Sequence, residues 1–157
     1  MSQEENQKAS TNTQQFTVQR IYLKDMSFET PAGVEIFKQQ WKPSIQMDVN
    51  TRNEVIDQDI YEVVLTITIT AKQGDDVGFL VEIQQAGIFI CKGFDANDLR
   101  QALSAACPNI LFPYARETID SIVVKGSFPA LMLAPMNFDA LYHQAMQQAA
   151  TKAQAKH

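Results

Sequence analysis

Residues 59–85, DIYEVVLTITITAKQGDDVGFLVEIQQ, decide the fold of this chain. From Leu65 to Thr70, aliphatic residues alternate with threonines, which is the period-two pattern of a strand with one buried face. QGDD at 73–76 predicts a turn. Residues 77–85 then alternate again, with Glu82 and Gln84 on the polar side. The sequence therefore predicts a long antiparallel hairpin that pairs 59–72 with 77–85.

Two more strands are predicted before the hairpin. The first, FTVQRIYLKD at 16–25, alternates so that Phe16, Val18 and Tyr22 share one side. The second, SIQMDVN at 44–50, places Ile45, Met47 and Val49 on one face. A looser segment with two prolines joins them, so it is expected to cross over between the strands.

Helical patterns fill the second half of the chain. Asp95 is suited to cap a helix that Pro108 is expected to end. A second helix is predicted from Phe112 to Gly126, a typical residue after a helix end, and a third after Asn137. Strands followed by helices predict an α+β fold, with the helices covering one face of an antiparallel sheet.

Length and composition indicate one soluble domain. The 157 residues fit a folded region at 16–148, with a disordered polar tail at 1–15 and a flexible tail at 149–157. No apolar signal segment and no bilayer-length apolar run is found, so we expect a cytoplasmic protein with no direct membrane insertion. With 18 acidic against 13 basic residues, the net charge of −5 argues against a nucleic-acid partner.

Residues suited to catalysis or metal binding are sparse. His143 falls on the predicted third helix and His157 ends the chain, without partners at ligand spacing. Cys91 and Cys107 stand apart among apolar residues and proline, which is typical of inert buried thiols. The acidic pairs fit turns and helix surfaces, and no phosphate-binding glycine motif is present. We therefore predict no enzyme activity, no metal and no cofactor.

Apolar residues exceed what a domain of this size needs for its core. Val64 and Leu80 fall on the mostly polar side of the hairpin, and the crossover segment adds Phe28, Ile36, Phe37 and Trp41. Such a surplus predicts either a subunit interface or a groove for apolar segments of another protein. Other interpretations stay open: a small apolar ligand-binding protein, a purely structural oligomeric adaptor, or an enzyme whose site forms only in the oligomer.

Three long motifs resemble the SecB family of bacterial protein-export chaperones: QRIYLKDMSFETP at 19–31, CPNILFPYARETIDSIV at 107–123 and GSFPALMLAPMNFDALY at 126–142. The resemblance runs from about Phe16 to Met146. Family members often end in an acidic tail, whereas this chain ends in TKAQAKH. The resemblance implies a four-stranded antiparallel sheet with helices packed on one face, assembled as a homotetramer, a dimer of dimers. It implies an ATP-independent holdase that binds unfolded preproteins and delivers them to the SecA motor.

The resemblance also implies where the binding surfaces lie. By position, the contact surface for SecA falls on Asp25, Glu29, Leu80 and Glu82. The strand residues that govern both tetramer assembly and client binding fall on Val81, Ile83 and Gln85, with Val81 at a position that is often cysteine in relatives. Trp41 falls where the family lines its client groove. To these we add apolar residues expected near the groove: Met47, Val49, Phe79 and Phe138.

Overall fold

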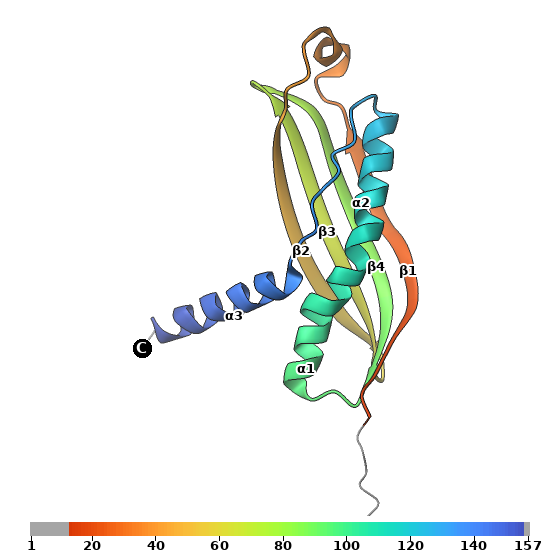
Figure 1. Ribbon diagram of the computed structural model, residues 1–157, viewed down its shortest axis with the longest axis vertical. Helices are drawn as coiled ribbons and strands as arrows, with labels where there is room; N and C mark the ends of the chain where they lie inside the picture. The colour runs from red at the N-terminus through yellow and green to blue at the C-terminus, as the bar shows by residue number, and fades with distance from the viewer. Residues whose placement is uncertain (1–12, 156–157) are drawn as a thin grey trace, which may run out of the picture.

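The computed structural model describes residues 13–155 (Figure 1). Its elements are β1 (Gln15–Glu29), the 3-10 helix η1 (Gly33–Lys38), β2 (Ser44–Asp57), β3 (Ile60–Gln73), β4 (Asp76–Lys92), α1 (Ala96–Gln101), the π-helical segment η2 (Ala102–Ala106), α2 (Cys107–Lys125) and α3 (Phe138–Gln154). Most of the predicted tail at 1–15 lies outside the described residues. Helix α3 continues into 149–157, the segment assigned to the other tail.

The four strands form one antiparallel sheet in the order β1-β4-β3-β2. The predicted hairpin is confirmed, since Gln73 pairs with Asp76 at its turn. Strand β4 runs on past Gln85, its predicted end, because it pairs with both β1 and β3 as far as Ile90. Strands β1 and β2 are the two edges, and residues 30–43 cross between them.

The predicted sidedness of β1 is wrong for Tyr22. Phe16 and Val18 lie opposite Cys91 and Phe89, but Tyr22 lies opposite Ala86 and so points to the other face of the sheet. The reason is a register shift between Val18 and Arg20, because an extra residue in a strand reverses the side chains beyond it.

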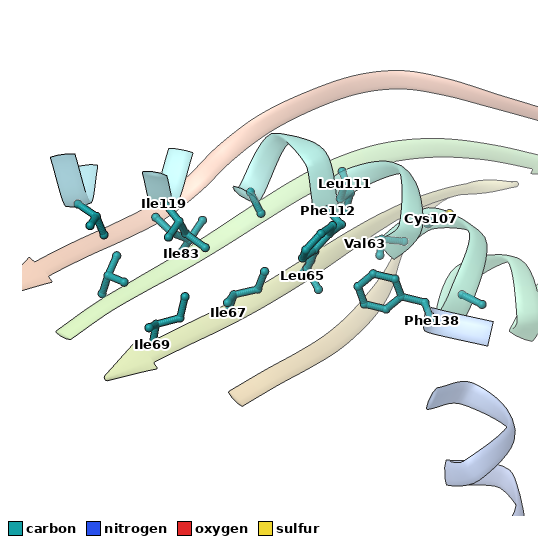
Figure 2. Packing of buried hydrophobic residues seen from close by; sticks show 14 of the residues in the cluster. Val63, Leu65, Ile67, Ile69, Ile83, Cys107, Leu111, Phe112, Ile119 and Phe138 are labelled. Atoms are coloured by element: carbon teal, nitrogen blue, oxygen red, sulfur yellow. The ribbon is translucent and has the colours of Figure 1, made fainter. Parts of the chain in front are cut away.

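Helix α2 covers one face of the sheet and builds the core with it (Figures 1 and 2). The aliphatic residues of β3 predicted to share a face are all buried there: Val63, Leu65, Ile67 and Ile69. Residues of α2 at four-residue spacing pack onto them: Leu111, Ala115, Ile119 and Val123. The threonines of β3 point to the opposite face, which we call the open face.

Pro108 does not end the first helix, contrary to the sequence prediction. Helices α1 and α2 are continuous through η2, where the backbone N–H of Cys107 donates to the carbonyl of Ala102, five residues earlier. Pro108 directly follows this π turn, whose hydrogen-bond spacing differs from that of an α-helix and so accommodates a residue without a backbone N–H. The wider π turn therefore carries the chain past the proline without a break.

The predicted N-caps are confirmed, whereas Gly126 has a different role from the expected one. Asp95 accepts from the N–H of Asp98 at 2.7 Å and Asn137 accepts from the N–H of Ala140 at 3.0 Å. Gly126 follows α2 but has φ −82°, and the left-handed residue is Ser127. A Cβ on Gly126 would lie 2.6 Å from the ring of Phe28, so close packing explains this glycine.

Helix α3 does not cover the sheet, contrary to the expectation of three covering helices. It projects away from the domain (Figure 1), and among its described residues only Phe138, in its first turn, is buried. Residues 126–137 form the connecting loop, which runs back over the sheet from the end of α2 to α3 (Figure 1). No helix in residues 13–155 is long and apolar enough to cross a membrane.

Candidate functional site: an apolar groove and an acidic sheet face

Trp41 belongs to an aromatic cluster at one end of the sheet. Its ring centroid is 4.8 Å from that of Phe128 and 6.1 Å from that of Phe79. Phe37 extends the cluster, 5.4 Å from Phe128, and is exposed. The cluster borders a pocket of about 150 Å³ lined by Phe37, Trp41 and Phe128. The rings thus form a pocket that is apolar and open to solvent.

Gly78 explains how the indole of Trp41 lies so close to the sheet. A Cβ at this position of β4 would lie 2.5 Å from Cη2 of Trp41 and 2.6 Å from Cζ3. These distances are well inside van der Waals contact, so a side chain here would collide with the ring. The indole therefore packs on bare backbone, and Phe79 beside it is fully buried.

A second pocket lies between β2 and the start of α3. Its volume is about 440 Å³. Its apolar lining comes from Val49 on β2 and from one stripe of α3: Phe138, Leu141, Tyr142, Ala145 and Met146. Arg100 and Ser104 add polar groups at the rim. Leu141 and Met146 are exposed, so this stripe has no covering element in residues 13–155.

Strand β2 connects the two pockets. Ile45, Met47 and Val49 lie opposite residues of β3 on the α2-covered face, so they share that face. Ile45 and Met47 are exposed, because β2 is an edge strand beyond the reach of α2. We call the two pockets and these three β2 residues the apolar groove. Together they place exposed apolar side chains along one edge of the sheet.

The predicted groove residues divide into two sets. Trp41, Met47, Val49 and Phe138 line the groove, and Phe79 lies beneath Trp41. Val81, Ile83 and Gln85 share that face of the sheet but are buried in the interior, away from the groove. The Gln85 side chain donates to the backbone carbonyl of Tyr22 at 3.0 Å and ties β4 to β1.

Sequence reasoning missed Phe128, Leu141 and Met146 as groove residues. Leu141 and Met146 fall on the predicted third helix. The expectation that all the helices cover the sheet assigns their apolar side chains to the core instead. Phe128 carried no signal of its own, since its partners Trp41 and Phe79 are distant in the chain.

The four residues predicted to contact SecA share the open face. Glu29 lies opposite Leu80, and Asp25 lies opposite Gln84. Directly opposed residues in an antiparallel sheet point to the same side, as do residues two apart in one strand. Asp25, Glu29, Leu80 and Glu82 therefore lie on the same side of β1 and β4, away from α2. Glu82 also accepts a hydrogen bond from the hydroxyl of Thr68 at 3.3 Å.

A neighbouring carboxylate on this face, Glu62, is paired with a lysine. Lys24 Nζ lies 2.7 Å from one oxygen of Glu62, and the hydroxyl of Tyr22 donates to the other. The hydrogen bond from Lys24 is the main cause that lowers the pKa of Glu62, and the bond from Tyr22 adds to it. Burial first, and Glu62 second, raise the pKa of Tyr22 to about 12. Ala86 of β4, the residue opposite Tyr22, has a small side chain on this face.

The remaining acidic residues of this surface keep their charge unpaired. Within residues 13–155, the ion pairs are Lys24–Glu62 and Lys38–Glu35, so Asp25, Glu29 and Glu82 have no ion-pair partner there. An unpaired cluster of one sign attracts a partner surface of the opposite sign. The open face beside β1 is therefore suited to a basic surface.

Groups with chemical reactivity lie outside both surfaces. Cys91 and Cys107 are buried, and burial raises the pKa of both thiols. His143 is exposed on α3, and His157 lies outside the described residues. In the described part of the chain, no group of three or more His, Cys, Asp or Glu residues could hold a metal ion.

The sheet order, the helix over one face and the open groove define a SecB-like chaperone fold. The solved SecB-like chaperone Rv1957 of Mycobacterium tuberculosis, in complex with a ChAD peptide from the HigA1 antitoxin, has this fold. It superposes with a TM-score of 0.61 at 13% identity, over 77% of this chain and 90% of that one.

The family follows from the sequence comparisons. The model of the family described as "Preprotein translocase subunit SecB" matches residues 9–149. The Protein-export protein SecB of Ectopseudomonas mendocina (strain ymp) is 57% identical over 139 residues, 88% of this chain and 86% of that protein. The protein of the same name from Stutzerimonas stutzeri (strain A1501) is 58% identical over 140 residues, 88% of this chain and 85% of that one. This chain belongs to the SecB family, as the resemblance of its motifs predicted.

Proposed function

We propose that this protein is an ATP-independent holdase chaperone of the cytoplasm, which binds unfolded preproteins in its apolar groove and delivers them to SecA for export. One observation carries the proposal: the groove along β2 keeps exposed apolar side chains between two pockets, from Phe37 to Met146. Apolar burial is non-directional, so such a groove accepts many sequences.

The size of the groove agrees with weak contacts repeated along an extended client. Burying one large apolar side chain contributes roughly 1.5–3 kcal/mol. Association costs on the order of 4–15 kcal/mol before ordering of the client is counted. One pocket is therefore too little, and several apolar side chains of one client must bind along the groove. Several subunits in one assembly offer several grooves to the same client, so its weak contacts add up to tighter binding.

The proposed assembly is a homotetramer, a dimer of dimers. Exposed apolar residues on the edge strand β1 support it, namely Phe16, Val18, Leu23 and Met26, together with Tyr114 and Val124 on α2. An exposed strand edge of 15 residues is a template for pairing with another chain. Val81, Ile83 and Gln85 are buried, so their proposed effect on assembly and client binding acts through the position of β4.

The proposed docking surface for SecA comprises Asp25, Glu29, Leu80 and Glu82. Its support is their common face and their unpaired charge. Glu82→Lys is expected to weaken SecA binding and to leave client binding unchanged. Glu54→Lys is a matched control, because Glu54 lies opposite Glu62 at the other edge of the open face. Equal loss of SecA and client binding in Glu82→Lys would show that this surface is assigned wrongly.

The direct test measures mass and aggregation. Light scattering of the full chain should give a mass near four subunits, and the protein should keep an unfolded preprotein from aggregating without ATP. Trp41→Ala should weaken this protection, because it removes a half-buried ring that lines the aromatic pocket. A monomeric protein that does not suppress aggregation would contradict the proposal.

A further inference from the structure

The connecting loop, residues 126–137, borders the apolar groove and has little regular hydrogen bonding. Phe128 is buried, and Leu131, Leu133 and Met136 are half-buried against the core. In residues 13–155, residues 129–136 hydrogen-bond to the rest of the chain through two side chains of α2. Since the loop has no ladder or helix to fix it, its path depends on this apolar packing and on the two α2 side chains.

Asp120 is the stronger of the two attachments. Its Oδ1 accepts from the backbone N–H of Leu131 at 3.0 Å and from that of Met132 at 3.2 Å. Two successive N–H groups that converge on one carboxylate form a compact anion-binding turn. Arg116 adds a longer bond, from Nη1 to the carbonyl of Leu133 at 3.5 Å. Both side chains come from the helix that covers the sheet.

Met132 is held in a conformation that its residue type disfavours. Its φ is 51°, in the left-handed region, which is unfavourable for a side chain without a local polar group. It is also 79% exposed, so burial of the methionine does not offset this cost. A strained residue persists only where its surroundings fix it, and here the bond from its own N–H to Asp120 does so.

We propose that Asp120 is a positioning residue, which stabilises the left-handed backbone at Met132 and thereby fixes the connecting loop as one wall of the client-binding groove. With the loop fixed, Leu131 and Leu133 face the core while Met132 points into solvent. Phe128 at the start of the loop is held against Trp41, and Phe138 just after it is held in the second pocket. The inference rests on the proposed function, because it assigns Asp120 a role in client binding.

The test compares Asp120→Ala with the matched control Glu117→Ala. Glu117 is an exposed carboxylate one turn earlier on α2, and it makes no hydrogen bond to the described part of the loop. Amide hydrogen exchange at Leu131 and Met132 is measured, together with binding of labelled, carboxymethylated α-lactalbumin, which is permanently unfolded. Asp120→Ala should speed exchange and weaken binding by roughly tenfold each, as expected for loss of a charge-assisted hydrogen bond. Glu117→Ala should change neither.

A second variant separates positioning from a general loss of structure. Asparagine tolerates the left-handed region, so Met132→Asn in the Asp120→Ala background should restore a large part of the binding. A merely destabilised helix would not be rescued by this change in the loop.

The outcomes are distinguishable. Faster exchange with unchanged binding, or no rescue by Met132→Asn, overturns the positioning role. Unchanged exchange shows that Asp120 does not hold the loop. Failure of the wild-type protein to bind the unfolded polypeptide overturns the proposed function instead, and the exchange experiment then still decides whether Asp120 fixes the loop.

Discussion

Gly78→Ala is expected to disturb the aromatic pocket while leaving the fold intact. The added Cβ would lie 2.5 Å from Cη2 and 2.6 Å from Cζ3 of Trp41. Carbon atoms pack at roughly 3.5 Å or more, so the indole must move by about 1 Å. The next nearest atom is the carbonyl oxygen of Ala71 at 3.5 Å, an ordinary contact. The collision therefore involves the ring alone.

Two opposing effects decide the cost for stability. Replacing a glycine inside a strand removes a penalty of about 0.5–1 kcal/mol. Overpacking costs about 1–3 kcal/mol where the surroundings are rigid. Trp41 is half-buried and its colliding atoms are at the free end of the ring, so it can move toward solvent. We expect the free energy of unfolding to change by less than about 1 kcal/mol.

Gly78→Ala should weaken client binding at the aromatic pocket more than it lowers the stability of the fold. Moving the indole disturbs its contact with Phe128, where the ring centroids are 4.8 Å apart. A displaced indole offers a client side chain less buried contact. Losing about 0.5–1.4 kcal/mol of the roughly 1.5–3 kcal/mol that one buried apolar side chain contributes corresponds to a roughly two- to tenfold loss of client affinity.

The assay uses Trp41 itself, because it is the single tryptophan of the chain. The Gly78→Ala protein should show red-shifted tryptophan emission, a urea midpoint close to wild type and weaker binding of a labelled unfolded polypeptide. In a Trp41→Phe background the colliding atoms are absent, so Gly78→Ala should no longer affect binding. Unchanged emission and binding, or a large loss of stability, would refute the reasoning.

Three further predictions concern the core, the open face and the thiols. Ile119→Ala should lower the free energy of unfolding by about 2–5 kcal/mol in urea titration, because Ile119 is fully buried between α2 and the sheet. The exposed Ser121→Ala on the same helix should change it by about 0.5 kcal/mol or less, and equal effects would contradict the core assignment. The folded-state pKa of Glu62 is lowered from 4.5, so its contribution to stability is present above that value and is lost as the pH falls through the folded pKa. The stability difference between wild type and Glu62→Gln should therefore be larger at pH 7 than at pH 3, and a difference independent of pH would exclude this linkage. Cys91 and Cys107 are buried with raised pKa values, so a thiol reagent at pH 8 should label them only as fast as the protein opens, and rapid labelling of the native protein would show that they are accessible.

The hairpin could be predicted from the sequence because its signal is local. Alternation along β3 reports directly which side chains are buried. The end of β4 could not be predicted in this way, because from Ala86 to Cys91 it carries apolar residues on both faces and the alternation disappears. The face of the sheet on which Tyr22 lies could not be predicted either, because a register shift does not change the residue composition of a strand.

The helical errors arise where packing outweighs a local rule. A proline inside a helical pattern ends the helix in most proteins, but here the π turn before Pro108 accommodates its missing N–H. Gly126 suggests a left-handed helix end, yet the ring of Phe28 requires the glycine and Ser127 takes the left-handed conformation. Neither the contact of Phe28 with Gly126 nor the π turn can be predicted from the neighbouring sequence.

The residues of the open face could be predicted from the sequence to a greater extent than those of the apolar groove. Period two places Leu80 and Glu82 on one face, whereas the placement of Asp25 and Glu29 beside them depends on the pairing of β1 with β4. The groove depends on contacts between distant residues, such as Trp41 with Phe128. Asp120 belongs to an acidic pair that the sequence assigns to a helix surface, and its role is not visible there because its partners lie 11 and 12 residues away in a loop without a repeating pattern.

Strand β4 serves both surfaces with successive residues. Phe79 lies beneath Trp41 on one face, and Leu80 points to the open face beside Glu29. A client in the groove and a partner on the open face would therefore be separated by the thickness of the sheet, so they do not compete for the same space. Coupling between them would need an element with two alternative arrangements that both ligands bias. The long strand ladders of β4 with β1 and β3 favour one arrangement. The proposed docking of SecA on the open face would therefore leave the groove accessible to a bound client, which is the physical reason why Glu82→Lys should spare client binding.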